Sequence, residues 1–203
     1  MNPRALFIVS LAACFLAAQA GAQSLVSGSV DAGKARSTVC SACHGQDGNS
    51  VNPLWPNLAG QHATYIVNQL TTFREGGKNP DTAARSDPLM TPQAMQLSDE
   101  DIANLAVYFE SLPAPAMPVA DASTVDKGVP ACFACHGPTG RGNPAAGYPS
   151  LKGQHATYTA KQLRAYASGS RQSDGKTRIM RDIASRLSED EIVAVASYVQ
   201  GLR

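Results

Sequence analysis

Cysteine, histidine and tryptophan are scarce in this sequence. Only five cysteines, four histidines and one tryptophan occur in 203 residues. Four of the cysteines lie in two short motifs, so no set of half-cystines is left for a disulfide framework. Charged residues make up only 16% of the chain, and their signs nearly balance, with 17 Lys and Arg and 16 Asp and Glu. The sequence lacks the basic patch of a nucleic-acid-binding protein, and we expect no nucleic-acid partner.

The chain has one long apolar run, at its N-terminus. Arg4 precedes the run from Ala5 to Ala18, and the small residues Ala20-Gly21-Ala22 follow it. This order predicts a secretory signal peptide over residues 1–22, with cleavage before Gln23. A retained membrane anchor is the less favoured alternative, because the run is shorter than the roughly 18 residues that a spanning helix needs.

A second alternative concerns Cys14. Leu11-Ala12-Ala13-Cys14 resembles the lipobox of bacterial lipoproteins, which would leave an acylated Cys14 at the mature N-terminus. The apolar run continues past Cys14, which favours ordinary cleavage. Either route exports the chain, and we expect a periplasmic protein with at most loose membrane association.

Two pentapeptides share the pattern C-x-x-C-H. They are Cys40-Ser41-Ala42-Cys43-His44 and Cys132-Phe133-Ala134-Cys135-His136, 92 residues apart. This pattern is typical of c-type haem attachment. Thiols three positions apart lie on one face of a helical turn, where they can form thioethers with two haem vinyl groups. The adjacent histidine can then reach the iron as proximal ligand, so the sequence predicts two covalently bound haem c groups.

Two other uses of such motifs are less favoured. A structural zinc site needs four ligands around each metal in a closed geometry. A thioredoxin-like dithiol needs a βαβ context, and the sequence has no such pattern.

The periodicity predicts an all-α chain. We expect helices over 31–43 with Asp31 as N-cap, over 62–74 with Gly76-Gly77 as its end, and after Ser98 and Ser188. Residues 45–60 and 78–92 are expected to be loops. In the first loop Pro56 or a neighbour can offer a carbonyl that fixes the imidazole of His44. Pro130 predicts that the helix carrying the second motif is short.

The second half of the chain repeats the first. Residues 60–65 return at 153–158, shifted by 93, and Leu97-Ser98 returns as Leu187-Ser188, shifted by 90. The period is too long for a solenoid and indicates a domain duplication. We predict four segments, listed here in chain order: a signal peptide at 1–22, a domain at 23–112, a Pro-rich linker at 113–123 and a domain at 124–203.

The repeat also selects the sixth iron ligand. Met180 is the only methionine of the second half and lies seven residues before Leu187. Seven residues before Leu97 is Met90, so Met90 and Met180 are the predicted axial ligands. Met95 is the reserve candidate, and Met117 falls in the linker.

Two further histidines compete as ligands. His62 and His155 each open a predicted helix beside a glycine, and we expect them to cap it or to lie at a solvated surface. His/Met ligation would fill both axial positions of each iron and raise its reduction potential relative to two histidines.

The ordered motifs resemble those of the di-haem cytochrome c4 family. The resemblance rests on the two C-x-x-C-H motifs, on Gly-Gln-x-x-x-Tyr at 60–65 and 153–158, and on the two methionines ahead of Leu-Ser-x-x-x-Ile. It implies two tandem class I cytochrome c-like domains in a pseudo-twofold arrangement. It also implies a periplasmic carrier that takes electrons from quinol–cytochrome c reductase and passes them towards a haem–copper oxidase.

Two other functions stay open from the sequence. A di-haem enzyme, such as a peroxidase or a thiosulfate dehydrogenase, would need an open iron position, whereas each half offers a methionine and the mature chain has no spare cysteine. A permanently bound oxidase subunit is the third possibility, and lipidation at Cys14 would favour it.

Overall fold

The computed structural model describes residues 24–119 and 130–202. The predicted signal peptide, Cys14, residues 120–123 of the predicted linker and the predicted domain start at 124–129 lie outside the described residues. Within them the chain is helical, and its only β pairing is an isolated bridge between Asn143 and Tyr148.

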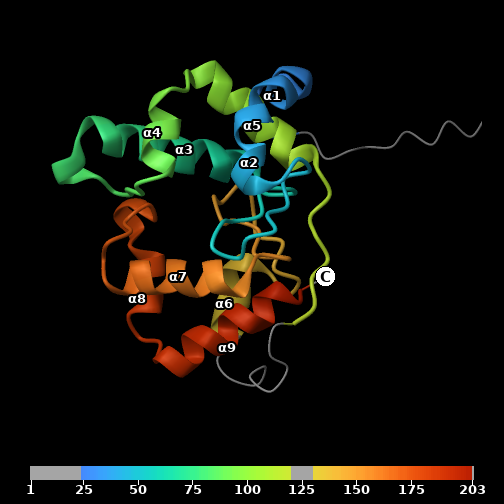
Figure 1. The fold of residues 1–203 in the computed structure, drawn as a ribbon. Coiled ribbons are helices and arrows are strands. Elements are labelled where there is room, and N and C mark those ends of the chain that lie inside the picture. The colour runs from blue at the N-terminus through green and yellow to red at the C-terminus, as the bar shows by residue number, and fades with distance from the viewer. Residues whose placement is uncertain (1–23, 120–129, 203) are drawn as a thin grey trace, which may run out of the picture.

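The two halves lie one above the other, with loops from both filling the space between them (Figure 1). The N-terminal half contains α1 (Val30–Arg36), η1 (Ser37–Val39), α2 (Ser41–His44), α3 (Ala63–Lys78), η2 (Pro80–Thr82), α4 (Met90–Met95) and α5 (Asp99–Ser111). The C-terminal half contains α6 (Pro130–His136), α7 (Ala156–Ala167), η4 (Gly175–Thr177), α8 (Ile179–Ala184) and α9 (Glu189–Gln200).

The last helix of each half begins with the same cap. Ser98 Oγ accepts a hydrogen bond from the Asp101 amide at 3.0 Å, and Ser188 Oγ accepts one from the Glu191 amide at 3.3 Å. The acidic side chain returns a bond to the serine amide in each case, which completes a capping box. The helix starts predicted at Ser98 and Ser188 are therefore confirmed.

The first predicted helix differs in its start and its continuity. Ser29, not Asp31, is the N-cap, because its hydroxyl accepts from the Ala32 amide at 3.2 Å. The helix also breaks into α1, the turn η1 and α2. Gly33 explains the packing of α1, since a Cβ there would lie 2.0 Å from the carbonyl oxygen of Asn104 in α5.

The prediction that Gly76-Gly77 ends a helix is wrong. Helix α3 runs on to Lys78 and includes both glycines. Their small size serves packing instead, because a Cβ at Gly76 would lie 2.5 Å from the Arg85 carbonyl oxygen and one at Gly77 2.4 Å from Met95 Sδ. The predicted loop over 78–92 is also too long, since Met90 already begins α4.

Each half has its own small core. Ile66, Leu105, Ala106 and Phe109 are buried in the N-terminal half, and Leu163, Ile192, Val195 and Val199 are buried in the C-terminal half. Cys40 packs against the first core, and Cys132 and Met180 pack against the second. The haem motifs therefore border the hydrophobic core of each half.

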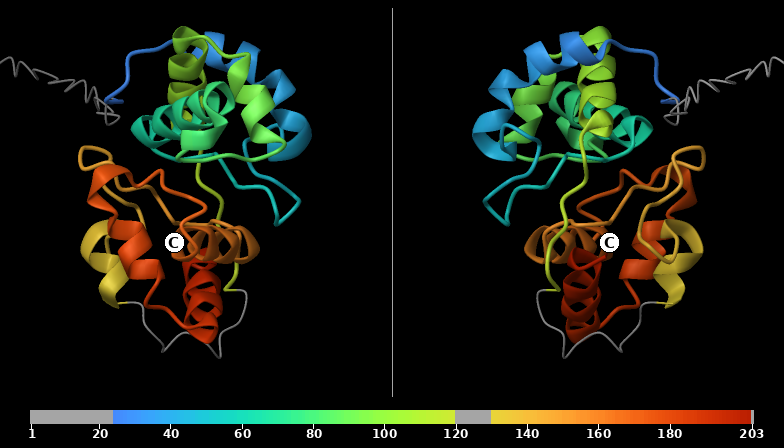
Figure 2. Two further views of the ribbon diagram at one scale, coloured as in Figure 1. Left: turned by 90° about the vertical axis from the view of Figure 1, so that its left-hand side faces the viewer. Right: turned by 90° about the vertical axis from the view of Figure 1, so that its right-hand side faces the viewer.

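The segment after α5 crosses from one half to the other along one side of the molecule (Figure 2). It passes two glycines at matching repeat positions. A Cβ at Gly60 would lie 2.7 Å from Ala114 Cβ, and one at Gly153 would lie 2.2 Å from the Pro115 carbonyl oxygen. Both glycines have positive φ, 70° and 65°, so the chain needs glycine there for its backbone as well. None of the described helices is long and apolar enough to cross a membrane.

Candidate functional site

The first C-x-x-C-H motif spans a tight helical turn. Cys40 precedes α2, and the helix ends on His44, whose side chain is buried. The His44 Nδ1–H donates to the Pro56 carbonyl oxygen at 2.8 Å, as the sequence predicted. This bond fixes the ring and leaves Nε2 as the free nitrogen.

The second motif repeats the arrangement. The motif lies within α6, which begins at Pro130 and ends on the buried His136. The His136 Nδ1–H donates to the Pro149 carbonyl oxygen at 2.9 Å. Pro56 and Pro149 are 93 residues apart, so the second contact is the repeat of the first.

Burial sets the protonation of both motifs. It lowers the pKa of His44 and of His136, although the bond to the proline carbonyl partly opposes the change. It raises the pKa of the Cys40 and Cys132 thiols. Each motif therefore presents a neutral imidazole, the form that can bind iron, beside thiols that are not paired in disulfides.

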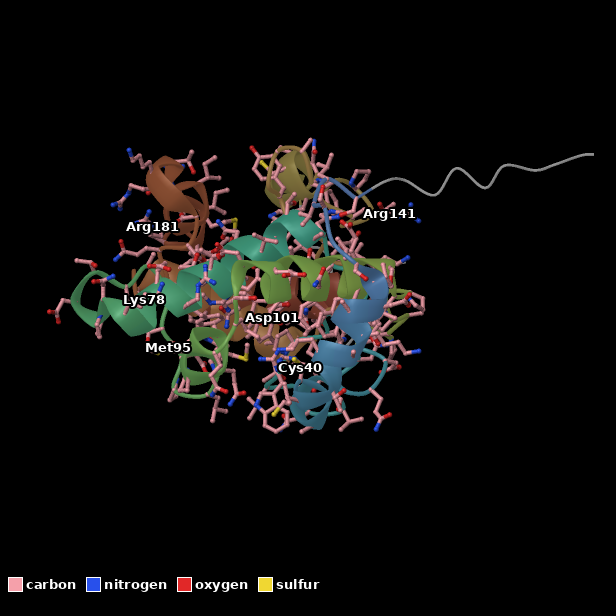
Figure 3. The ribbon with its side chains drawn as sticks, turned by 90° about the horizontal axis from the view of Figure 1, so that it is seen from above. Cys40, Lys78, Met95, Asp101, Arg141 and Arg181 are labelled. Carbon is pink, nitrogen blue, oxygen red and sulfur yellow. The ribbon has the colours of Figure 1, made fainter. Side chains whose placement is uncertain are left out.

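The four methionines of the described chain occupy different environments. Met90 and Met180 are half-buried in α4 and α8, and Met180 packs against the same core as Cys132. Met95, labelled in Figure 3, is 50% exposed, and its Sδ lies against Gly77 of α3. Met117 Sδ lies 3.5 Å from the Asn57 side-chain nitrogen, at the boundary between the halves.

The loops that follow the haem motifs also join the two halves. Gln154 accepts from the Asn57 amide at 3.0 Å and donates to the Asn57 carbonyl at 3.0 Å. Gln61 does the same with Ser150, at 2.9 Å and 2.8 Å. Because both pairs are related by the offset of 93, the interface has approximate twofold symmetry.

His62 and His155 belong to this interface, which corrects the prediction that they cap helices or face solvent. Neither side chain caps its helix. The Nε2–H of His62 donates to the Arg141 carbonyl at 2.6 Å, and that of His155 donates to the Ser50 carbonyl at 2.9 Å. Each bond crosses between the halves, so the two histidines connect the halves to each other.

A second symmetric network surrounds two buried arginines. Arg85 donates to Tyr158 Oη at 3.0 Å and lies over the Phe73 ring, 4.3 Å from its centroid. Arg171 donates to Tyr65 Oη at 2.7 Å and lies over the Tyr166 ring at 4.5 Å. Each guanidinium therefore reaches across the interface to the tyrosine of the other half.

The glutamines Gln69 and Gln162 complete this network. Gln69 accepts from Arg85, and from Arg171 at 2.9 Å. Gln162 accepts from Arg85 at 3.1 Å and from Arg171 at 2.6 Å. Each amide oxygen thus binds both guanidinium groups, which holds two like charges close together.

The two arginines keep their charge without an acidic partner. They are only 8% and 4% exposed, and among the described residues neither has a carboxylate within 4.0 Å. Burial alone would lower the pKa of Arg171, but the neighbouring tyrosine oxygens, that of Tyr65 included, outweigh it and raise the pKa. Burial would likewise raise the pKa of Tyr158, and the charges of Arg85 and Arg171 overcome it and lower the pKa.

These residues fit a haem c in each half. Each motif offers two thiols on one helical turn and an imidazole with a free Nε2 beside a hydrophobic core. The described residues contain no group of three His, Cys, Asp or Glu side chains that could hold a metal ion.

The sequence analysis missed the arginine network and the glutamine pairs. A signal was present, since Gln61, Tyr65 and Gln69 all recur 93 residues later. That recurrence was interpreted only as shared origin. Arg85 and Arg171 are 86 residues apart, so the offset of 93 did not bring them together.

Comparison with known proteins agrees with this geometry. The sequence profile of the Cytochrome c family matches residues 30–113 and 126–203. Cytochrome c4 of Azotobacter vinelandii is 43% identical over 189 residues, which cover 86% of this chain and 90% of that protein. The thiosulfate dehydrogenase electron acceptor of Stutzerimonas stutzeri is 38% identical over 78% of this chain and 76% of its own length.

A solved structure shows the same arrangement of two domains. The crystal structure of reduced recombinant cytochrome c4 from Pseudomonas stutzeri superposes with a TM-score of 0.82 at 41% identity, over 87% of this chain and 100% of that chain. The two halves are thus cytochrome c domains, and each C-x-x-C-H motif attaches a haem c. With two such domains and a match along most of its length, the chain belongs to the cytochrome c4 family of di-haem electron carriers.

Proposed function

We propose that this chain carries electrons in the periplasm from quinol–cytochrome c reductase to a haem–copper oxidase. The observation that supports it is the equivalence of the two ligand sets: one oriented imidazole and one repeat-matched methionine in each half. The ligand pairs are His44 with Met90 and His136 with Met180. The cysteines Cys40, Cys43, Cys132 and Cys135 form the thioethers.

Each bound haem supplies one-electron cycling between ferric and ferrous iron. The protein residues set the conditions for that cycling. The proline carbonyl bonds keep each imidazole in one orientation. The methionine thioether is a neutral donor that raises the reduction potential and closes the sixth position to oxygen or peroxide.

The proposed boundaries follow the same scheme. Residues 1–22 are removed as a signal peptide, 23–112 and 124–203 form the two haem domains, and 113–123 link them. Across the interface, Arg85 of the first domain donates to Tyr158 and Arg171 of the second donates to Tyr65, so each domain contributes to the electrostatic environment of the other.

Reconstitution with purified partners tests the proposed route. The oxidised holoprotein is mixed with quinol and quinol–cytochrome c reductase, and its reduction is followed optically. In a second mixture the reduced holoprotein meets a haem–copper oxidase. We expect both reactions at rates that support turnover, and failure of either one would remove that partner from the proposal.

A second electron donor is supported by one comparison. The relative from Stutzerimonas stutzeri, 38% identical, is named an electron acceptor of thiosulfate dehydrogenase. In the same assay, thiosulfate with its dehydrogenase is offered in place of quinol and reductase. Faster reduction in this mixture would assign the chain to thiosulfate oxidation.

The fate of Cys14 needs a separate measurement. Mass spectrometry of the mature N-terminus would show whether Cys14 is lipidated.

A further inference from the structure

A buried ion pair joins α8, the helix that carries Met180, to the segment ahead of it. Asp174 precedes the turn η4, and Arg181, labelled in Figure 3, directly follows Met180 in the helix. The Arg181 Nε–H donates to Asp174 Oδ1 at 2.8 Å, and the two side chains are only 11% and 4% exposed. The pair therefore fixes the position of α8 immediately beside Met180.

The carboxylate of Asp174 also binds the backbone of α8. Its Oδ2 accepts from the Arg181 amide at 3.0 Å, the amide that follows Met180. This amide lies in the first turn, where no carbonyl of the helix can reach it. Arg178, at the N-cap, has a left-handed conformation (φ 54°, ψ 12°), and its side chain makes no cap hydrogen bond. Asp174 thus takes the place of the missing cap.

The guanidinium of Arg181 ties the segment down at two further points. It donates to Gln172 Oε1 at 3.1 Å and to the Gly175 carbonyl at 2.7 Å. The Gln172 amide in turn donates to the Ala84 carbonyl of the N-terminal half at 2.6 Å. The segment ahead of Met180 is therefore bound both to its own helix and to the other half of the chain.

The N-terminal half holds its methionine in a different way. Asp87 Oδ1 accepts from the Leu89 amide at 2.9 Å and from the Met90 amide at 3.1 Å. At the offset of 90 that relates the two methionines, Asp174 corresponds to Ala84, so the buried pair is not a copy of anything in the first half. Each half anchors its methionine helix through a carboxylate, and in the C-terminal half that carboxylate belongs to a buried ion pair.

We propose that Asp174 and Arg181 are positioning residues that hold Met180 on its iron. The thioether can leave the iron only when α8 moves, and the pair must break before α8 can separate from the segment ahead of it. Breaking the pair leaves a buried charge without its partner, which is costly. The inference rests on the proposed ligation by Met180 and adds to it which residues keep the thioether in place.

Displacement of the thioether by imidazole measures how readily Met180 leaves. In the oxidised holoprotein the iron–sulfur bond breaks, an imidazole nitrogen takes the sixth position, and no electron is transferred. At saturating imidazole the observed rate is the rate of thioether release. The parent for this measurement carries Met90→Ala, so that the sulfur-to-iron absorption band reports Met180 alone.

Two replacements of Asp174 test the pair in this parent. Asp174→Ala should speed the loss of the band at least about tenfold, because the guanidinium of Arg181 is left buried and unpaired. Asp174→Asn keeps the size of the side chain and one acceptor oxygen, but loses the charge that strengthens its hydrogen bonds, and should give at least about a threefold increase. It carries the test where the alanine variant does not fold, and a release rate within about twofold of the parent would overturn the proposal.

The other methionine gives a matched comparison. In a parent that carries Met180→Ala the band reports Met90, and there Asp87→Ala should speed the loss of the band. Asp174→Ala should leave that rate within about twofold, because its contacts anchor α8 and not α4. Equal acceleration of both methionines by Asp174→Ala would overturn the proposal.

Two controls separate positioning from charge and from overall stability. Asp182→Asn removes a carboxylate of the same helix whose pair with Arg178 is exposed, and should leave the release of Met180 within about twofold. Ser188→Ala removes the cap of α9 and should lower the urea midpoint without faster release, because release is a local opening. Acceleration by Ser188→Ala as large as that by Asp174→Ala would overturn the proposal.

The same spectra distinguish the inference from the ligand assignment beneath it. Absence of the band in the Met90→Ala parent before imidazole is added would overturn both. A band that is present, with release rates that do not respond to Asp174, would overturn the inference and leave the ligand assignment intact.

Discussion

The glutamine pairs predict how much the interface depends on each side chain. Replacing Gln154 by Ala removes two bonds to the backbone of Asn57, both at 3.0 Å. Replacing Gln61 by Ala removes two bonds to Ser150, at 2.9 Å and 2.8 Å. At about 1 kcal/mol for each hydrogen bond, either change should weaken the association of the halves by about 2 kcal/mol.

Hydrogen exchange measures this effect at single amides. In Gln154→Ala the Asn57 amide loses its acceptor, and its protection in the holoprotein should fall at least fivefold more than that of the Ser150 amide, which keeps its acceptor Gln61. In Gln61→Ala the two outcomes exchange places. A loss of about 2 kcal/mol corresponds to a roughly thirtyfold shift of the equilibrium between joined and separated halves.

The control is Gln93→Ala. Gln93 is exposed in α4, and within the described part of the chain its side chain makes no hydrogen bond. This change should alter neither amide and should shift the free energy of unfolding by less than about 0.5 kcal/mol. Full protection of both Asn57 and Ser150 in the two interface variants would refute the account of how the halves are joined.

Two other changes test the packing and the caps. Gly33→Ala places a Cβ against the Asn104 carbonyl oxygen and should destabilise the holoprotein by about 1–3 kcal/mol in urea unfolding, and an unchanged midpoint would show that α1 can move away freely. The bond from the Ser98 amide holds the pKa of Asp101 below its usual value, so its stabilising effect is present above the unfolded pKa of about 4 and is lost as the pH falls through the folded value. Asp101→Asn should therefore be less stable than the parent at neutral pH and equal to it near pH 2, and a difference that persists in acid would contradict this.

Local signals in the sequence were sufficient for much of the site. The C-x-x-C-H motif and the capping box, a serine followed three residues later by an acid, each lie within a single helical turn. Residues that are neighbours in the sequence therefore determine both features. The proline carbonyl that binds His44 was also predictable, because the loop that follows the motif is rich in breakers and directly adjoins it in the sequence. These features do not depend on how the two halves meet.

What the sequence did not reveal comes from contacts distant along the chain. Gly77 is a helix breaker by propensity, yet it remains in α3 because only glycine leaves room for Met95. His62 and His155 lie beside helix starts, which suggested caps, while their actual acceptors belong to the other half of the chain.

The central claim is that one imidazole and one thioether occupy the two axial positions of each of two haem irons. It is tested most directly by the sulfur-to-iron absorption band of the oxidised holoprotein, after mass spectrometry has counted the attached haems. We predict two attached haems. The band should fall to about half its strength in Met90→Ala and in Met180→Ala, and it should be absent when both methionines are replaced. Met95→Ala should leave the band unchanged. A single haem, or a band that keeps its full strength in Met90→Ala or in Met180→Ala, would contradict the account.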